Sequence, residues 1–149
     1  MVISMNLKLQ DIRENNELTQ KAVADILNVS QLTYSRWEKK IEIIPLNKLI
    51  LFAKYFNVSL DYLYNLSLIK KENKNYNYIV NKELSSNNII NFRKKNNLTQ
   101  KELAIFLNTT PSTICAYEKG KTLILTSFAY QICKKYSISM DYISGITKN

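Results

Sequence analysis

The side chains of this sequence that could do chemistry are polar and basic groups spaced along short helical segments. Gln31 and Arg36 lie five positions apart in one such segment. A glutamine amide can pair with the N6 and N7 edge of adenine, and an arginine guanidinium can pair with O6 and N7 of guanine. Leu32, beside Gln31, can contact a thymine methyl group. These residue types are therefore suited to binding base edges of double-stranded DNA.

The sequence offers little for catalysis or metal binding. It has no histidine and only two cysteines, so no set of metal ligands can be assembled, and no nucleophile–base set or phosphate-binding loop is recognisable. Cys115 and Cys133 match Ser35 and Ala53 in the repeat described below, on an outward and an inward helix face, so we expect no disulfide. We expect Cys115 to be inert rather than reactive. The sequence predicts no enzyme, no metal and no cofactor.

Two copies of one segment organise the chain. Residues 18–40, LTQKAVADILNVSQLTYSRWEKK, recur in register as residues 98–120, LTQKELAIFLNTTPSTICAYEKG. Such self-similarity at a fixed spacing predicts two copies of one structural unit. We therefore expect a first domain over residues 1–67, a linker over 68–87 and a second domain over 88–149.

Each repeated segment has the pattern of two short helices joined by a tight turn. Thr19 can cap a helix over about residues 19–27, in which apolar residues at i, i+1 and i+4 form an inward stripe. Asn28 follows where the turn needs a left-handed residue, a conformation that asparagine tolerates better than most residues. Ser30 can then cap a second helix over about residues 30–39. The pattern predicts a helix-turn-helix motif in each copy.

Further helical patterns complete each copy. The chain has only two glycines and two prolines, which argues against a turn-rich β fold. In the first copy we expect an initial helix with Ser4 as a candidate cap, and helices after Pro45 and Ser59; the three cover about 5–15, 46–56 and 60–65. In the second copy we expect an initial helix from near Ser86, another over about 126–136 and a last one capped by Ser139. The predicted class is all-α, with five helices in each domain.

The charge is positive and unevenly distributed. The net charge of +9 suits a polyanionic partner. Residues 1–67 carry a net +1, residues 68–87 a net +2 and residues 88–149 a net +6. The sequence shows neither a basic-then-apolar N-terminal signal nor a long apolar run, so we expect a cytoplasmic protein without a membrane segment.

The two repeated segments, followed by SLDYL in the first copy and SMDYI in the second, resemble the lambda-repressor-like (Cro/XRE) helix-turn-helix family. The resemblance implies a five-helix all-α domain whose third helix enters the DNA major groove. Members are mostly transcriptional repressors of phages, mobile elements and bacterial operons, and they often act as dimers on palindromes. It therefore implies a sequence-specific DNA-binding transcription regulator, a repressor of phage or mobile-element type, with double-stranded DNA as its partner and a homodimer as an option.

The resemblance also assigns roles to individual residues. In the first copy it places on the DNA side of the third helix Gln31, Leu32, Thr33, Ser35 and Arg36. The second copy has short side chains at these positions, of which the candidates for base contact are Ser112 and Thr113. Phosphate contacts are expected from polar and basic groups that flank the motif in both copies: Thr19, Gln20, Lys39, Lys40, Arg93, Gln100, Lys101, Lys119, Lys121 and Thr122. The first copy is thus expected to read bases and the second to contact the backbone.

Two acidic residues at matching places are expected to hold the fold together. Glu38 and Glu118 lie near the end of the third helix in each copy, and we expect each to pair with Arg13 or Arg93. Two roles are open to the loop after Glu38: Ile41, Ile43 and Ile44 close the core, which we favour, or form a protein contact.

An alternative function keeps the same fold but a different partner. The side chains of the second copy at the base-contacting positions are short and suit base reading poorly. They are also compatible with a protein-interaction module, such as an antitoxin or a phage-encoded inhibitor that also represses its own gene. The sequence identifies neither the operator nor a partner protein.

Overall fold

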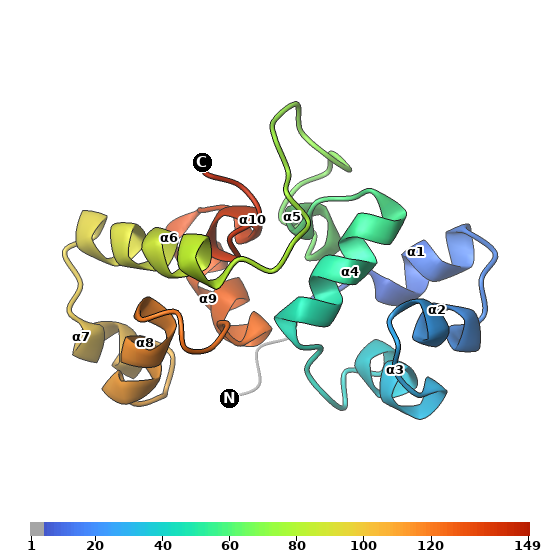
Figure 1. The fold of residues 1–149 in the computed structure, drawn as a ribbon, viewed down its shortest axis with the longest axis horizontal. Coiled ribbons are helices and arrows are strands. Elements are labelled where there is room, and N and C mark those ends of the chain that lie inside the picture. The colour runs from blue at the N-terminus through green and yellow to red at the C-terminus, as the bar shows by residue number, and fades with distance from the viewer. Residues whose placement is uncertain (1–4) are drawn as a thin grey trace. The chain divides into compact units, whose positions relative to one another are not determined.

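The computed structural model describes residues 5–149 of the chain, and within this range it contains ten helices and no strand. The helices divide into two compact units, residues 1–72 and 73–149 (Figure 1). The predicted all-α class with five helices in each unit is confirmed. None of the helices in the described range is long and apolar enough to cross a membrane.

The first unit is built from five short helices. They are α1 (Leu9–Asn15), α2 (Gln20–Ile26), α3 (Gln31–Glu38), α4 (Leu46–Phe56) and α5 (Leu60–Leu63). The first helix was expected to begin at residue 5 but begins at Leu9. The N–H of Lys8 donates to the carbonyl of Leu63 (2.9 Å) and so ties this part of the chain to α5 instead of joining the helix. Ser4, the expected cap, lies outside the described residues.

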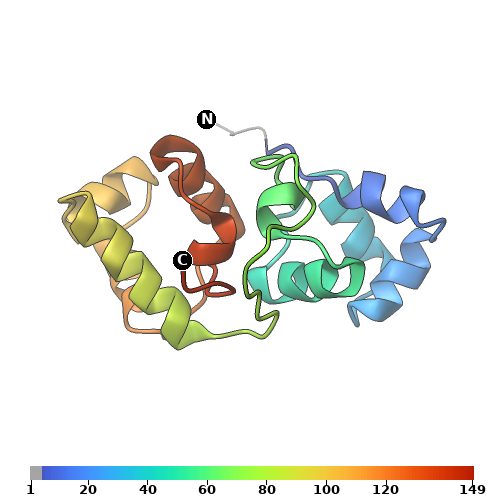
Figure 2. The ribbon, with the colours of Figure 1, turned by 90° about the horizontal axis from the view of Figure 1, so that it is seen from above.

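The second unit repeats the order. Its helices are α6 (Lys82–Lys95), α7 (Gln100–Phe106), α8 (Pro111–Glu118), α9 (Thr126–Tyr136) and α10 (Met140–Ile143). Within this unit α10 packs against both α6 and α9 (Figure 2). In each unit the third helix, α3 or α8, follows the second after a tight turn, as the repeated motif predicts.

Local capping explains where the motif helices begin. The Thr19 hydroxyl accepts a hydrogen bond from the N–H of Ala22 (3.1 Å), and the Ser30 hydroxyl accepts one from Thr33 (3.1 Å). Asn28 adopts a left-handed φ of 56° in the turn between the two helices. These three sequence predictions are confirmed. They place α3 directly after α2, with a backbone N–H of its first turn hydrogen-bonded by the capping side chain.

The loop after α3 closes the core with one of its three isoleucines. Ile44 is buried, with 2% of its surface exposed. Ile41 is 60% exposed and Ile43 is 42% exposed, so the expectation that all three close the core is correct for Ile44 and wrong for the other two. Residues at i and i+3 of an irregular loop need not face the same side, and here the backbone returns toward α3 before it enters the core.

The first helix of the second unit begins earlier than predicted. It was expected near Ser86, but α6 begins at Lys82, where the Asn81 side chain accepts a hydrogen bond from the N–H of Leu84 (2.9 Å). Its buried face is polar at this end, so it lacks the apolar periodicity that marks a helix in sequence. Ser85 donates to the carbonyl of Ile143 (2.8 Å), which satisfies its buried hydroxyl.

The expected linker, residues 68–87, is largely held by the two units. The N–H of Ser59 donates to the carbonyl of Lys70 (2.8 Å), and the Lys71 ammonium donates to the Asn57 side chain (3.0 Å) in the first unit. In the second unit the N–H of Asn77 donates to a backbone carbonyl near the chain end (2.9 Å). Only residues 72–76 lie between these two sets of contacts.

One backbone position differs between the copies and predicts a stability change. Lys40 has a φ of 60°, whereas the matching Gly120 has a φ of 68°. Glycine adopts this left-handed conformation without the steric cost that other residues meet. Removing a left-handed cost of about 1–2 kcal/mol against the entropic cost of glycine, about 0.5–1 kcal/mol, Lys40→Gly should stabilise the first unit by about 0.5–1 kcal/mol. The measurement is urea unfolding followed by the fluorescence of Trp37, the single tryptophan.

The second unit supplies the matched control. A Cβ atom built on Gly120 would lie 3.6 Å from its nearest neighbour, an ordinary contact, so Gly120→Ala tests the backbone conformation alone. It should destabilise the second unit by a similar amount, seen as a lower melting temperature by circular dichroism. A loss of stability in Lys40→Gly would contradict this account of the loop.

Candidate nucleic-acid interface

A buried ion pair links the first and third helices of the first unit. Arg13 donates to both carboxylate oxygens of Glu38, from Nε to Oε2 at 2.7 Å and from Nη2 to Oε1 at 3.0 Å. The Glu38 side chain is only 2% exposed. Arg13 also donates to the carbonyl of Leu18 (2.9 Å), and Gln20 at the start of α2 donates to Glu38 (3.0 Å). One carboxylate thus holds α1, α2 and α3 together.

The second unit builds the same arrangement. Arg93 donates to Glu118 at 2.6 and 2.9 Å and to the carbonyl of Leu98 at 2.8 Å, while Gln100 donates to Glu118 at 3.2 Å. The predicted pairing of each glutamate with its arginine is therefore confirmed in both copies. Bidentate arginine–carboxylate pairs fix direction as well as distance, so α3 and α8 are held in a defined orientation.

The network shifts the acidity of its members. Burial alone would raise the pKa of Glu38, but hydrogen bonds from Arg13 and Gln20 favour the charged carboxylate, and the pKa lies below its usual value. For Arg13, the hydrogen bonds that it donates to Glu38 outweigh the effect of burial, and its pKa is raised. Both groups stay charged at neutral pH, and the ion pair is maintained.

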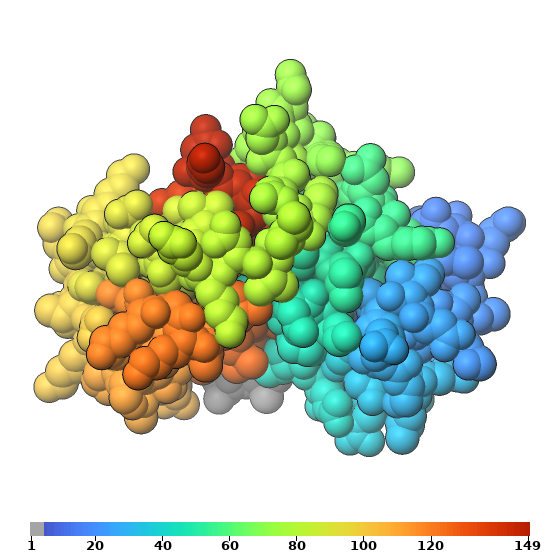
Figure 3. Space-filling model, viewed as in Figure 1, coloured from blue at the N-terminus to red at the C-terminus, as the bar shows by residue number. Residues whose placement is uncertain are grey.

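The outer face of α3 is accessible to a ligand. Gln31 and Leu32 are exposed, and the side chains of Thr33, Ser35 and Arg36 are partly exposed. The space-filling view shows the α3 region, in light blue, at the surface of the first unit (Figure 3). The structure therefore brings the five predicted base-contacting residues of the first copy onto one accessible helix, with the inner face anchored by Tyr34 and Trp37.

Arg36 has an acidic neighbour that the sequence analysis did not identify. Its Nε lies 2.7 Å from Oε1 of Glu42 in the loop after α3. The two side chains are 42% and 47% exposed, so the ion pair lies at the surface and not in the core. The sequence gives one signal for it, a carboxylate six positions after an arginine, but only the loop path brings the two together.

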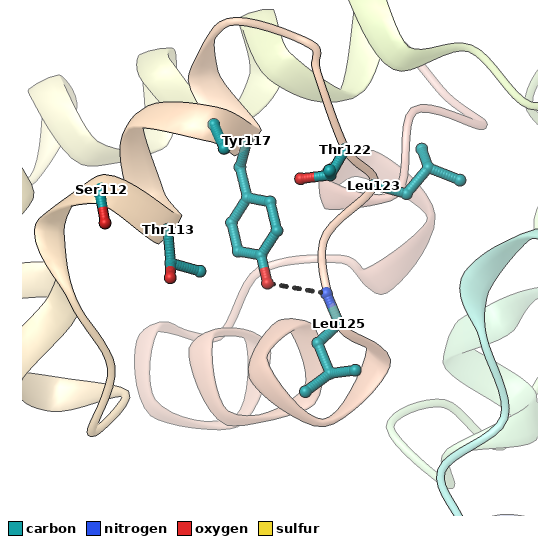
Figure 4. Close-up of a pocket in the computed structure, with 7 residues that line it drawn as sticks. Ser112, Thr113, Tyr117, Thr122, Leu123 and Leu125 are labelled. Carbon is teal, nitrogen blue, oxygen red and sulfur yellow. Dashed lines mark hydrogen bonds between the residues drawn. The ribbon is translucent and has the colours of Figure 1, made fainter.

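The outer face of α8 is different. Ala116 and Thr122 occupy the positions of Arg36 and Glu42, and the surface there is hollowed into an open cavity of about 430 Å³. The predicted base-contacting residues Ser112 and Thr113 line this cavity (Figure 4). Tyr117 also lines it, and its hydroxyl accepts a hydrogen bond from the N–H of Leu125 (3.4 Å). The second unit thus presents a shallow face without long side chains.

The predicted phosphate-contacting residues fall into two groups. Most of them are exposed around the motif helices: Thr19, Lys39, Lys40, Lys101, Lys119, Lys121 and Thr122. The other three have partners inside the fold, because Gln20 and Gln100 donate to the buried glutamates and the Arg93 guanidinium is directed to Glu118 and Leu98. The amides of Gln20 and Gln100 each keep a second N–H that could donate to a phosphate. The Arg93 side chain is only 15% exposed, so it is not part of the candidate interface.

Neither a metal site nor a disulfide is found among residues 5–149. No group of three potential metal ligands lies together there. Cys115 and Cys133 are both free thiols, as expected from their opposite helix faces. The exposed polar faces of α3 and α8 with their flanking lysines remain the candidate interface.

Comparison with known proteins agrees with this geometry. The sequence pattern of the helix-turn-helix family matches residues 9–63 and again residues 89–143, which together make up most of the chain. The protein therefore belongs to the lambda-repressor-like (Cro/XRE) helix-turn-helix family and contains two copies of its domain. No solved structure gives a significant match.

Two curated relatives match parts of the chain. The HTH-type transcriptional activator BcrR of Enterococcus faecalis is 33% identical over 86 residues, which cover 52% of this chain and 42% of the relative. The uncharacterized HTH-type transcriptional regulator YobD of Bacillus subtilis (strain 168) is 28% identical over 60 residues, 40% of this chain and 54% of the relative. The matches thus span about half the length of these relatives.

The Arg13–Glu38 pair predicts how the stability of the first unit depends on pH. A carboxylate whose pKa is lowered by folding stabilises the fold above its unfolded pKa, and this contribution is lost as the pH falls through the folded pKa. The free energy of unfolding should therefore fall on acidification below about pH 4.5, the ordinary value for this carboxyl. Glu38→Gln should remove about 3 kcal/mol at pH 7 by breaking a buried pair and should flatten this pH dependence.

The neighbouring Glu14 provides a control with the same charge change. It lies 3.7 Å from Arg13 but is 55% exposed, so Glu14→Gln should change stability by no more than about 0.5 kcal/mol. Urea unfolding followed by Trp37 fluorescence measures both variants. Equal effects of the two substitutions would show that the Glu38 pair does not anchor α3.

Proposed function

We propose that the protein is a sequence-specific DNA-binding transcription regulator in which the first unit reads bases and the second contacts the DNA backbone. The observation that carries this proposal is the outer face of α3, where Gln31 and Arg36 are accessible while the inner face is anchored by a buried ion pair. A rigid helix with long polar side chains on one side suits the major groove of B-DNA. Family membership and the names of the two relatives support the regulatory role.

Base reading by the first unit rests on chemistry and placement together. Gln31 lies in the first turn of α3 and is exposed, and its amide can bond N6 and N7 of adenine. Arg36 lies more than one helical turn further on and can bond O6 and N7 of guanine. Leu32 is 68% exposed and suits a thymine methyl group. Together these side chains can distinguish neighbouring base pairs.

Backbone contact by the second unit rests on charge and on its short side chains. Residues 88–149 carry a net +6, and Lys119 and Lys121 are exposed directly after α8. Ser112 and Thr113 have short side chains, which reach few base edges. Such a surface would add affinity for any sequence by neutralising phosphates. The short connection between the units would keep the second one at high effective concentration near DNA bound by the first.

We propose repression as the direction of regulation, of a phage or mobile-element type. A protein bound across a promoter excludes RNA polymerase without needing any further contact. One relative is named an activator, and the position of the operator relative to the promoter would decide between the two effects. Because the two units carry different surfaces, a monomer would favour an asymmetric site, and a palindrome would require a homodimer.

A protein-interaction module on the same fold is the second candidate. Ile41 and Ile43 favour it, because both are exposed beside the DNA-facing loop of the first unit, and a protein partner could cover them. An antitoxin or phage-encoded inhibitor that represses its own gene would use both surfaces. Binding assays that find a protein partner but no preferred DNA sequence would support this function over the first.

The first functional prediction concerns base reading. Gln31→Ala and Arg36→Ala should each reduce specific affinity by about 1–3 kcal/mol, because each removes a bidentate base contact. Affinity for random DNA should fall much less. Gln10→Ala is the control, since Gln10 lies on α1 and is bonded to Glu14. Equal losses on specific and random DNA in fluorescence anisotropy titrations would mean that Gln31 and Arg36 touch only phosphates.

The second functional prediction concerns the backbone contacts. Replacing Lys119 and Lys121 together by alanine should weaken binding to all sequences alike and reduce the slope of log affinity against log salt by about one for each lost phosphate contact. Lys134→Ala, in the last turn of α9, should leave the slope nearly unchanged. An unaltered salt slope in the double variant would contradict the proposal that the second unit contacts the DNA backbone through these lysines.

A further inference from the structure

The loop after α3 brings a carboxylate to the DNA-facing side of the first unit. The carbonyl of Arg36 accepts hydrogen bonds from the N–H groups of Ile41 (2.9 Å) and Glu42 (3.4 Å), so the backbone turns back over the end of the helix. This places the Glu42 carboxylate beside the Arg36 side chain, 2.7 Å from Nε. The loop backbone, rather than the flexible side chains alone, sets this arrangement.

Fold stability does not account for this pair. Half-exposed ion pairs contribute little to stability, because solvent screens them and two long side chains must be ordered. The buried Arg13–Glu38 pair already anchors α3. In addition, a carboxylate on a surface that approaches phosphates weakens binding to any DNA. A negative group in this position therefore needs a compensating interaction in the bound state.

The second unit shows that the fold does not require the pair. Its loop makes the same return, with the N–H of Lys121 donating to the carbonyl of Ala116 at 3.0 Å. The side chains are replaced by Ala116 and Thr122, and the open cavity occupies their place (Figure 4). The same backbone therefore carries a charged pair in one unit and a hollow in the other.

The chemistry of the pair matches one base pair. The ion pair brings Glu42 to the Nε side of the guanidinium, so the two terminal amino groups of Arg36 remain as donors and the carboxylate keeps a second oxygen as acceptor. In the major groove a G·C pair presents two acceptors, N7 and O6 of guanine, beside one donor, the N4 amino group of cytosine. Building on the base reading proposed above, we propose that Arg36 and Glu42 read one G·C base pair together, Arg36 bonding guanine and Glu42 bonding cytosine N4.

Glu42 then acts in two ways within the proposed site. It holds the guanidinium in one orientation, which lowers the conformational freedom lost when guanine is bound. It also rejects A·T at this position, because thymine presents an acceptor oxygen and a methyl group where cytosine presents a donor. The specificity of Arg36 is thereby extended to both bases of the pair.

The test is a selection of bound sequences from random double-stranded DNA with the full chain, followed by affinity measurements on the preferred site. Glu42→Gln keeps the shape of the side chain but removes its charge, and its amide can donate as well as accept. It should reduce the preference for G·C over A·T at one position by about tenfold. Replacing the cytosine at that position by its analogue without the 4-amino group should weaken DNA binding by the wild-type protein by a similar factor. It should weaken DNA binding by Glu42→Gln much less.

Asp25→Asn is the matched control. Asp25 forms the exposed pair with Lys21 on α2, at 3.4 Å, so this variant removes the same charge away from α3. It should change affinity for all sequences alike and leave the preferred site intact. If Glu42→Gln and Asp25→Asn behave alike, Glu42 acts only as a charge and the inference is overturned. If wild-type protein binds DNA but selects no sequence, the proposed base reading itself fails, and the role of Glu42 fails with it.

Discussion

The bidentate pair between Arg13 and Glu38, repeated as Arg93 and Glu118, is the interaction on which the arrangement of each unit depends. A single buried carboxylate receives hydrogen bonds from the first and second helices and lies at the end of the third. Removing either partner would leave a buried charge without compensation, which is costly. The pair therefore fixes the direction of α3 and α8 while using none of the residues on their outer faces. This separation leaves the outer faces free to differ.

The two units use that freedom in opposite ways. In the first unit α3 carries long polar side chains, one of which forms an exposed ion pair with the following loop, whereas α8 carries short side chains beside an open cavity. The positive charge is concentrated in the second unit, with a net +1 over residues 1–67 and a net +6 over residues 88–149. One scaffold thus offers a surface suited to discriminating base pairs and another suited to phosphates. Two linked surfaces of this kind would combine specificity and affinity in one chain.

Much of this could be predicted from the sequence because it is local or repeated. Thr19, Asn28 and Ser30 act on backbone groups within a few residues, and the Arg13–Glu38 pair was visible because Arg93 and Glu118 repeat it. The beginning of α6 was missed because Ser85 faces inward and is satisfied by a distant carbonyl, which no periodicity reveals. The Arg36–Glu42 pair and the exposure of Ile41 and Ile43 depend on an irregular loop path, and sequence patterns describe such paths poorly.

The central claim, that one unit reads bases and the other contacts the backbone, is tested most directly by selecting bound sequences from random double-stranded DNA with the full chain. The account predicts one short asymmetric motif, which Gln31→Ala and Arg36→Ala degrade and which alanine at both Lys119 and Lys121 leaves unchanged while weakening all binding. A motif that depends on the second unit, or binding without any motif, would contradict it.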